Sequence, residues 1–372
     1  MSETLLAKQK SNLPEINIMW DPRRGNLGEG IGFKESLKKP VAYETLGRKN
    51  AGKSSLSEVL AAHYPKVIDL FGSRDNEGLC WVRSPFGKQV LFLKGNSVKI
   101  DCNCADIINA TDVKVSDFEK YQAVVSCSCF YGDMTEEWHA LTKLMSKLWH
   151  RSYWTEPWCV LIREAANLLY SRLALGENQY QAKNYMIYVL REMRHHGYAL
   201  ALDTLRMYSI DADVRALSDF IFIKALGIEG LQAELRWVYK YYKPKSLMKL
   251  KPEQFIIVSN CGPLGVGWFD YPSWHKKEHE NLIREFDIQI TYGQVPHIPG
   301  SGSSQVGDYE HLRIIKSRIE TGKSMDVLAA ELGRSSRTIH KHITLHNNMI
   351  RTLGECDTCA RVNGEYKRRV TD

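Results

Sequence analysis

The pattern of hydrophobic and polar positions changes near residue 40. Before it, prolines and glycines interrupt the apolar runs, so residues 1–39 are predicted to form an N-terminal arm. After it, short apolar runs alternate with longer amphipathic ones. Strands are predicted at 41–46, 66–71, 89–93, 121–127, 158–162, 198–202 and 219–225, and helices at 54–64, 135–154 and 178–196. This alternation predicts an α/β domain over 40–295, with a mainly parallel sheet and helices on both faces.

A second change lies at 296–308, where Gly, Ser and Pro replace the periodic pattern and predict a linker. The last unit, 309–372, contains a helix, a tight turn and a second helix over 324–343. Gly333 permits the turn, and Ser335 is placed to cap the second helix. The apolar positions that would pack the two helices together are Leu328, Ala329, Leu332, Ile339 and Ile343.

Composition narrows the class of protein. The chain has 372 residues, 44% of them hydrophobic and 25% charged, which is ordinary for a globular protein. Its net charge of +7 favours a polyanionic partner. Nine scattered cysteines without regular spacing indicate a reducing compartment. Because the sequence has neither a signal peptide nor a long apolar run, we expect a cytoplasmic protein (in the host cytoplasm if it is viral) without a membrane partner.

The most specific motif is GRKNAGKS at 47–54, which matches the phosphate-binding pattern G-x-x-x-x-G-K-[ST] between a predicted strand and a predicted helix. In such a loop, backbone N–H groups surround the β-phosphate, Lys53 reaches the β- and γ-phosphates, and the Ser54 hydroxyl ligates Mg²⁺. ATP and Mg²⁺ are therefore the expected cofactors. The predicted binding residues are Gly47, Asn50, Ala51, Gly52, Lys53, Ser54 and Ser55. The alternative is a Gly- and Ser-rich turn that binds nothing.

A second motif follows the strand at 158–162. Glu164 is placed to activate the attacking water, but Arg163 stands where an acid should help to hold Mg²⁺. An arginine cannot ligate magnesium. Asp69 and Asp203, at or near strand ends, are the candidate substitutes. Otherwise Ser54, phosphates and waters hold the ion alone, or turnover is slow. Glu164 can also be read as an ordinary carboxylate at a helix N-terminus.

These motifs resemble the HerA/FtsK superfamily of DNA-pumping ATPases, and most closely its archaeal and viral genome-packaging branch. The similarity covers roughly 38–260: the loop at 47–54, the segments 67–72 and 162–169, and the stretch 190–197 that leads into 199–204. It implies a RecA-like P-loop NTPase fold. It places Asp203 and Thr204 where the family has Thr-Gln as a γ-phosphate sensor, so both join Lys53 and Glu164 as catalytic candidates. It also implies a homo-oligomer, usually a hexameric ring, in which a neighbour supplies an arginine; Arg172, Arg191, Arg194 and Arg215 are candidates.

The C-terminal unit resembles a helix-turn-helix domain, whose second helix enters the major groove of double-stranded DNA. No acidic residue occurs from Leu332 to Gly354. Residues 359–370 could form a two-stranded wing that turns at Asn363-Gly364. The predicted DNA contacts are Arg334, Ser336, Arg337, His340 and Lys341, with Lys367, Arg368 and Arg369 on the wing. The alternative is a small helical cap or protein-docking module.

Three further stretches have two readings. Cys356 and Cys359 have zinc-ligand spacing, but zinc needs four ligands; His340, His342 and His346 lie near in sequence, and the ligand count favours two reduced cysteines. The segments 236–251 and 272–277 interleave basic and aromatic residues, which fits either a DNA-tracking surface or an amphipathic element with its aromatics in the core.

The sequence therefore predicts an ATP-dependent DNA translocase or packaging-type motor, with a capsid or mobilisation protein as a further partner. The alternative is a DNA-binding regulator or replication or partition initiator that uses ATP as a switch. A third class, a nucleotide-binding adaptor without DNA affinity, disagrees with the basic second helix of the C-terminal unit.

Overall fold

The structure, a computed structural model, describes residues 13–24, 32–72, 76–149, 156–166, 191–192, 194–205, 216–228, 230–292, 303–332, 335–353, 356 and 359. The chain divides into two compact units, Met1–Val295 and Pro296–Asp372, called unit 1 and unit 2 below. In the described part of the chain, no helix is both long and apolar enough to cross a membrane.

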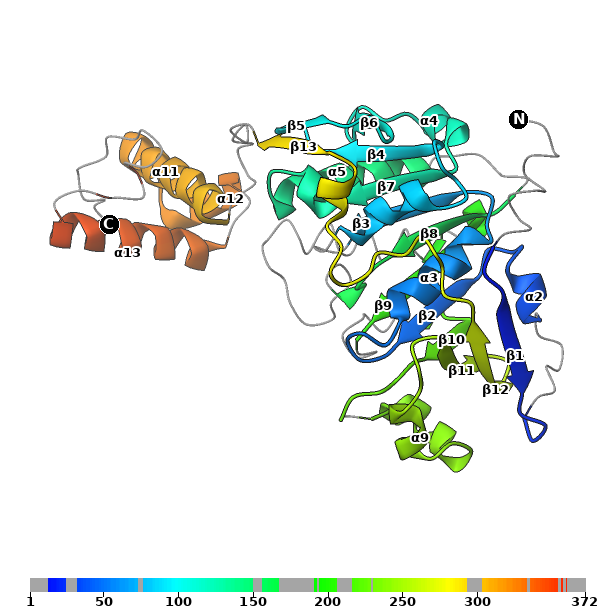
Figure 1. The fold of residues 1–372 in the computed structure, drawn as a ribbon. Helices are drawn as coiled ribbons and strands as arrows, with labels where there is room; N and C mark the ends of the chain where they lie inside the picture. Colours follow the sequence, from blue (N-terminus) through cyan, green and yellow to red (C-terminus); the bar gives the residue numbers. More distant parts are fainter. Residues whose placement is uncertain are drawn as a thin grey trace. The chain divides into compact units, whose positions relative to one another are not determined.

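Unit 1 is built on one large twisted sheet (Figure 1). Eight neighbouring strands run parallel, in the order β10 (Phe220–Ile223), β2 (Ala42–Leu46), β9 (Tyr198–Thr204), β8 (Trp158–Ile162), β3 (Val67–Gly72), β7 (Ala123–Cys127), β4 (Val90–Lys94) and β6 (Asp106–Asn109). Three antiparallel strands extend the β10 edge: β11 (Gln254–Ser259), β12 (Leu264–Phe269) and β1 (Ile16–Trp20). The inner parallel strands are almost wholly buried, as expected when both faces of a sheet are covered.

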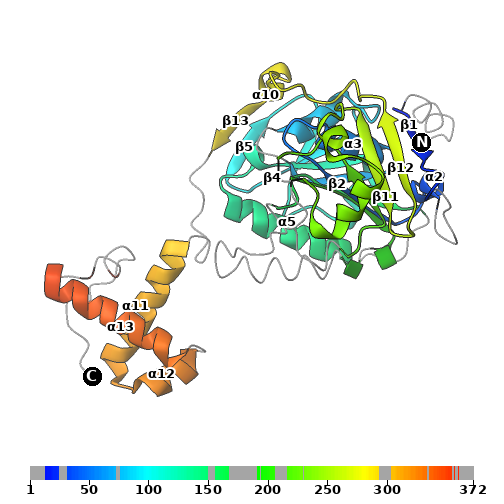
Figure 2. The same ribbon diagram turned by 90° about the horizontal axis from the view of Figure 1, so that it is seen from below.

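Helices cover the two faces of this sheet. Helix α3 (Lys53–Ala62) connects β2 to β3, and α5 (Met134–Trp149) connects β7 to β8. These connections cross the sheet in opposite directions, so right-handed crossovers put the two helices on opposite faces, as Figure 2 shows. The predicted fold class is confirmed: unit 1 has a P-loop NTPase fold, in which β9 lies between the loop-bearing β2 and β8.

Shorter elements complete unit 1. The helical ones are α2 (Phe33–Ser36), η1 (Glu77–Arg83), α4 (Val115–Lys120), η2 (Ser128–Phe130), η3 (Arg194–His196), η5 (Ala233–Lys240), α9 (Pro244–Met248) and α10 (Leu282–Glu285). Strands β5 (Val98–Asp101) and β13 (Gln289–Tyr292) form a separate antiparallel pair. Most of the helix predicted at 178–196 lies outside the described residues.

The structure differs from the sequence predictions in several places, and three of them follow. Residues 16–20 of the expected arm form β1, an edge strand that needs only β12 as its partner. Helix α11 begins at Ser303, inside the segment predicted as a linker. Cys102 and Cys104, just after β5, pair in a disulfide that the sequence analysis did not predict, because a bend brings the two close together.

The described part of unit 2 contains the helices α11 (Ser303–Thr321), α12 (Met325–Leu332) and α13 (Ser336–Leu353). As the apolar pattern predicted, Leu328 and Ala329 of α12 are buried together with Ile339 and Ile343 of α13. Ser335 caps α13, since its Oγ accepts a hydrogen bond of 3.2 Å from the backbone N–H of Thr338. Helices α12 and α13 thus pack through apolar positions named from the sequence, while Gly333 of the predicted turn lies outside the described residues.

Candidate nucleotide site and nucleic-acid surface

The loop at 47–52 leaves the carboxyl end of β2, where parallel sheets bind ligands. Asn50 and Gly52 have left-handed backbones, with φ of 59° and 76°. A Cβ on Gly52 would lie 2.4 Å from the carbonyl oxygen of Pro252, and one on Gly47 would lie 2.7 Å from Cβ of Lys224. Both positions therefore require glycine, because the loop packs tightly against Lys224, which follows β10, and against Pro252, which precedes β11.

Lys53 begins α3 and is almost fully buried. Its Nζ donates to the backbone carbonyl of Arg48 at 3.1 Å, so the ammonium group lies against the loop. Ser54, at the start of the same helix, is half-buried. Ser55 is buried, and its hydroxyl donates to the Tyr271 hydroxyl at 2.7 Å. Like Lys53, this predicted binding residue therefore has a partner within the protein. Tyr271, which the sequence did not single out, thereby lies beside the loop helix.

Asp203 occupies the carboxyl end of β9, between the strands that carry the loop and Glu164. Its Oδ1 accepts a 2.6 Å hydrogen bond from the backbone N–H of Glu164, while its buried Oδ2 has no hydrogen-bond partner among the described residues. Burial raises the pKa of Asp203 to about 6, although the charge on Lys53 acts in the opposite direction. Thr204, the next residue, is also buried and lies opposite Leu46 of the loop strand. Asp203 is thus a buried acid with one oxygen available to a ligand.

Glu164 is exposed just beyond β8 and has a left-handed backbone, with φ of 43°. Such a conformation costs roughly 1–3 kcal/mol for a residue with a side chain, so surrounding contacts must maintain it. Asp203 supplies them twice: its side chain binds the N–H of Glu164, and its carbonyl accepts from the N–H of Ala165 at 2.7 Å. The chain therefore holds Glu164 in a strained turn, with Asp203 as the anchor.

Arg163 is fully buried and binds carboxylates from three elements. Its guanidinium lies 2.6 Å from Glu58 of α3, 2.7 Å from Asp69 of β3 and 3.2 Å from Glu77 of η1. Asp69 also accepts from the indole N–H of Trp81 at 2.7 Å. Of the two acids predicted to replace the missing ligand, Asp69 is engaged by Arg163, and Asp203 retains an oxygen without a partner.

The partners of Arg163 were not found from sequence, because they lie 86 to 105 residues from it along the chain. Burial raises the pKa of Glu58, but the charges on His275 and Arg163 outweigh that and lower it to about 2. His275 Nδ1 lies 2.9 Å from Glu58, and Trp274 is buried beside it. The DNA-surface reading of 272–277 is therefore wrong for these two side chains, which belong to the core.

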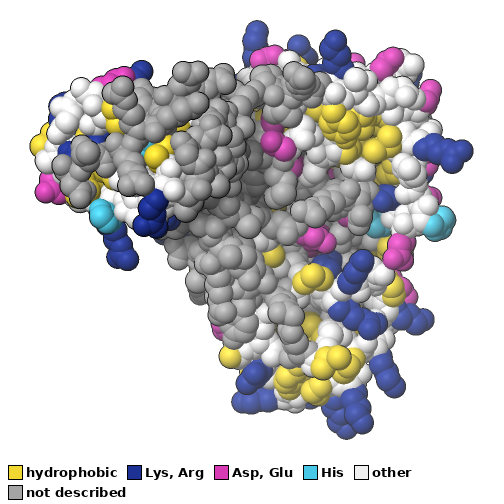
Figure 3. All heavy atoms as spheres, turned by 90° about the vertical axis from the view of Figure 1, so that its left-hand side faces the viewer, with side chains coloured by type: hydrophobic (Ala, Val, Ile, Leu, Met, Phe, Trp, Pro, Cys, Tyr) yellow, Lys and Arg dark blue, Asp and Glu magenta, His cyan; other side chains and the backbone are white. Residues whose placement is uncertain are grey.

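The basic and aromatic segment 236–251 divides between both earlier readings. Trp237, Tyr239, Tyr241 and Tyr242 pack against a buried apolar cluster, as in an amphipathic element. The basic side chains are exposed, and no acid interrupts them: Arg236, Lys240, Lys243, Lys245, Lys249 and Lys251. Figure 3 shows Lys and Arg side chains gathered among apolar ones at the end of unit 1 that carries α9. The cations of this segment face solvent, and its aromatic rings pack against the apolar cluster.

In unit 2, the side chains of Ser336, Arg337, His340 and Lys341 are all exposed on α13. Ser336 donates to Asp326 of α12 at 2.6 Å, which fixes the start of α13. The other predicted DNA contacts, Arg334, Lys367, Arg368 and Arg369, lie outside the described residues. So do Arg172 and Arg215, two of the arginines considered for service to a neighbouring subunit.

Comparisons with known proteins add structural likenesses. No family model matches the sequence, and a search of curated proteins finds no match. The genome-packaging NTPase B204 of Sulfolobus turreted icosahedral virus 2, in complex with ATP-gammaS, is 21% identical, with 64% of this chain and 97% of that chain covered and a TM-score of 0.35. The DNA-packaging ATPase B204 from Sulfolobus turreted icosahedral virus is 21% identical, with coverage of 65% and 100% and a TM-score of 0.36.

A structure of Thermomonospora curvata EccC, comprising ATPases 2 and 3 with a signal sequence peptide, is 12% identical, with coverage of 62% and 37% and a TM-score of 0.35. Identities this low concern the fold alone. The P-loop NTPase fold of this chain is established by its strand order and by the position of its loop.

Proposed function

We propose that unit 1 binds and hydrolyses ATP at the loop 47–54, and that the chain is a DNA translocase or packaging-type motor. The observation that carries the catalytic part is Asp203. Its carboxylate is buried between the loop strand and β8, and the charge on Lys53 acts against burial to lower its pKa. One of its oxygens has no partner among the described residues. A buried acid without a partner is costly unless it meets a ligand, and a cation beside a triphosphate is such a ligand.

The residues fit a magnesium nucleotide. Lys53 would exchange the Arg48 carbonyl for the β- and γ-phosphates, and the Ser54 hydroxyl and ionised Asp203 would hold Mg²⁺. When bound, Mg²⁺ neutralises charge on the phosphate oxygens. The exposed carboxylate of Glu164 would accept the proton of the attacking water, and Asp203 would hold Glu164 in place through its backbone. Thr204 would serve beside Asp203 as a polar contact for the γ-phosphate.

Double-stranded DNA is the proposed substrate of the motor. Support comes from the exposed Arg337, His340 and Lys341 on α13 and from the acid-free row of cations over 236–251. The B204 proteins are described as genome-packaging and DNA-packaging enzymes, which agrees with this proposal. A homo-oligomeric ring, hexameric by resemblance, would let a neighbour contribute an arginine. A capsid or mobilisation protein would be the further partner.

The test is ATP turnover with and without duplex DNA, for the wild type and for Glu164→Gln. We expect DNA to stimulate turnover, and Glu164→Gln to lower it by about 10²–10⁴-fold while nucleotide still binds, as for loss of a general base. The matched control is Glu156→Gln, an exposed carboxylate ahead of β8. Unchanged turnover in Glu164→Gln would refute the catalytic assignment, and turnover indifferent to DNA would refute the motor.

A second function is favoured by one observation. Arg163 stands at the position of the missing acid and forms an ion pair with Asp69. Fewer carboxylates would therefore be available near the phosphates than a fast ATPase uses. In that case the chain would be a DNA-binding regulator or initiator that assembles when ATP binds. Tight, ATP-dependent DNA binding with negligible turnover would identify this switch.

A further inference from the structure

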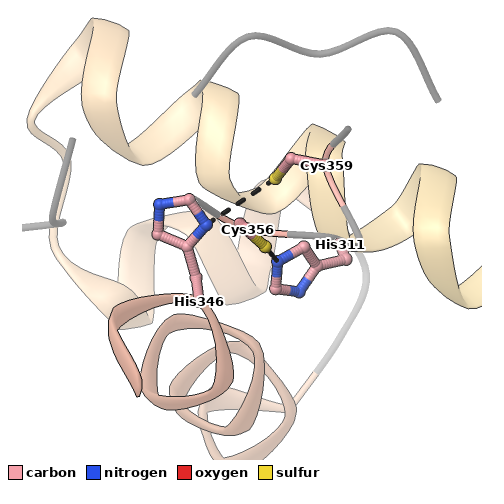
Figure 4. Close-up of side chains that lie close together, drawn as sticks. All are labelled: His311, His346, Cys356 and Cys359. Atoms are coloured by element: carbon pink, nitrogen blue, oxygen red, sulfur yellow. Dashed lines mark hydrogen bonds between the residues drawn. The ribbon is translucent and has the colours of Figure 1, made fainter. Parts of the chain in front are cut away.

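Four side chains with metal-ligating atoms converge inside unit 2. They are His311 on α11, His346 on α13, and Cys356 and Cys359 after α13 (Figure 4). All four are buried, and their nearest ligand atoms lie within 4.8 Å of one another. Figure 4 shows the two imidazole rings and the two sulfur atoms directed toward one common point. His311 was not named as a candidate ligand from the sequence, because it lies 45 residues before Cys356.

We propose that these four residues form a structural zinc site. Two thiolates and two imidazoles are a common ligand set of structural zinc, and a Cys-x-x-Cys pair is a common part of it. Soft sulfur with imidazole in tetrahedral geometry selects zinc over magnesium, calcium and manganese. A closed site with four buried protein ligands fits a structural role, since a catalytic zinc keeps one position open for water.

The distances agree with one ion at the centre. With Zn–S of about 2.3 Å and Zn–N of about 2.05 Å, a tetrahedral site places sulfur and nitrogen about 3.6 Å apart. Sγ of Cys356 lies 3.4 Å from Nε2 of His311, and Sγ of Cys359 lies 3.6 Å from Nδ1 of His346. The two cysteine–histidine pairs thus have the separation that shared coordination requires.

The surroundings of His311 support the same assignment. If Nε2 binds the metal, the ring proton sits on Nδ1, which lies 3.1 Å from Nδ1 of His342. His342 can accept that proton's hydrogen bond when its own proton is on Nε2. Metal-binding histidines usually donate their second ring N–H to a fixed acceptor, which orients the ring. His342, which the sequence put forward as a ligand, is instead the orienting partner of one.

A metal at this site would add a cross-link to the small core of unit 2. Among the described residues, the buried aliphatic core of unit 2 consists of a few side chains from α11, α12 and α13, and small domains commonly need a metal or disulfides in addition. A zinc ion would join α11, α13 and the chain after α13 through its ligands alone. It would thereby fix α13, which carries the exposed Arg337 and Lys341, but the metal site itself does not depend on the proposed ATPase or on DNA.

The first experiment is elemental analysis of the full chain purified without chelator, for zinc, iron, copper and nickel together. We expect about one zinc ion per chain. Cys359→Ser and His311→Asn should lose most of it, whereas Cys261→Ser, at an exposed free cysteine of unit 1, should keep it. Zinc retained at the wild-type level in both ligand variants overturns the site, and so does iron or copper in place of zinc.

A second measurement covers the case in which the ligand variants do not fold. Zinc is removed from the wild type with a chelator and Co²⁺ is added as the probe. Tetrahedral sulfur and nitrogen coordination gives intense visible bands and a thiolate-to-cobalt absorption, which zinc then displaces. These bands should appear in the wild type and in Cys261→Ser. A wild-type chain that carries no zinc and gives no such bands contradicts the proposal, whatever the ATPase assays show.

Discussion

Replacing Arg163 by Met tests whether its guanidinium stabilises unit 1 by compensating the buried carboxylates of Glu58 and Asp69. The side chains of Arg163, Glu58 and Asp69 have no exposed surface. Without the guanidinium, Glu58 keeps His275 as its cationic partner among the described residues, and Asp69 keeps the Trp81 indole N–H. Removal of one member of a buried ion pair typically costs about 3–5 kcal/mol, because it leaves an uncompensated charge inside the protein.

Arg83→Met is the matched control. Arg83 also binds two carboxylates, Glu280 and Glu285, but these side chains are partly exposed. Exposed ion pairs contribute about 0–1 kcal/mol, so the control should lose little stability. Arg163→Lys should lie between the two variants, since a single ammonium group cannot match the forked geometry of a guanidinium.

The assay is urea unfolding followed by tryptophan fluorescence. The last tryptophan of the sequence is Trp274, so all of this signal comes from unit 1, whatever unit 2 does. We expect Arg163→Met to lower the urea midpoint of unfolding strongly at pH 7 and less at pH 5. At pH 5, Glu58 and Asp69, which have lost their guanidinium partner, can take up protons. A loss of stability equal to that of Arg83→Met, at both pH values, would refute the reasoning.

Three more predictions follow from individual residues. Burial raises the pKa of Asp203 to about 6, so binding of magnesium nucleotide should strengthen as the pH rises from 5 to 7. Asp203→Asn should remove this pH dependence. A pH profile that is the same in the wild type and in Asp203→Asn would contradict the assignment. Gly52→Ala should cost more than about 1 kcal/mol on urea unfolding and weaken nucleotide binding, since φ is 76° and the new Cβ would meet Pro252. Gly87→Ala, at φ of 51° with no atom within 4 Å, measures the backbone term alone, so equal losses would exclude the packing argument. Arg337→Ala with Lys341→Ala should weaken duplex DNA binding and lower the slope of log affinity against log salt by about 2, and an unchanged slope would remove α13 from the interface.

The parallel strands and the loop could be predicted because each is a local pattern. A strand buried on both faces is a continuous apolar run, as at Trp158–Ile162, and the loop motif is contiguous in sequence. Strands at and next to the edge of the sheet carry a weaker signal: β1 at the edge and β12 beside it face solvent in part and contain polar residues or glycine, so their sequences resemble loops.

The chemistry assembled by tertiary contacts could not be predicted. Arg163 contacts Glu58 only because β8 and α3 pack together, and His311 contacts Cys356 only because the chain after α13 returns to α11. The departure at Arg163 was visible in the sequence, but its cause was not. Only the structure distinguishes the engaged Asp69 from Asp203 with its free oxygen.

The most direct test of the account is calorimetric titration of the full chain with a non-hydrolysable ATP analogue and Mg²⁺. The wild type and Lys49→Ala, an exposed lysine of the same loop, should bind alike. Lys53→Ala should bind at least about tenfold more weakly, the effect of losing charged hydrogen bonds to the phosphates. A wild-type chain that releases no heat of binding, or a Lys53→Ala variant as tight as its parent, would contradict a nucleotide site in this loop.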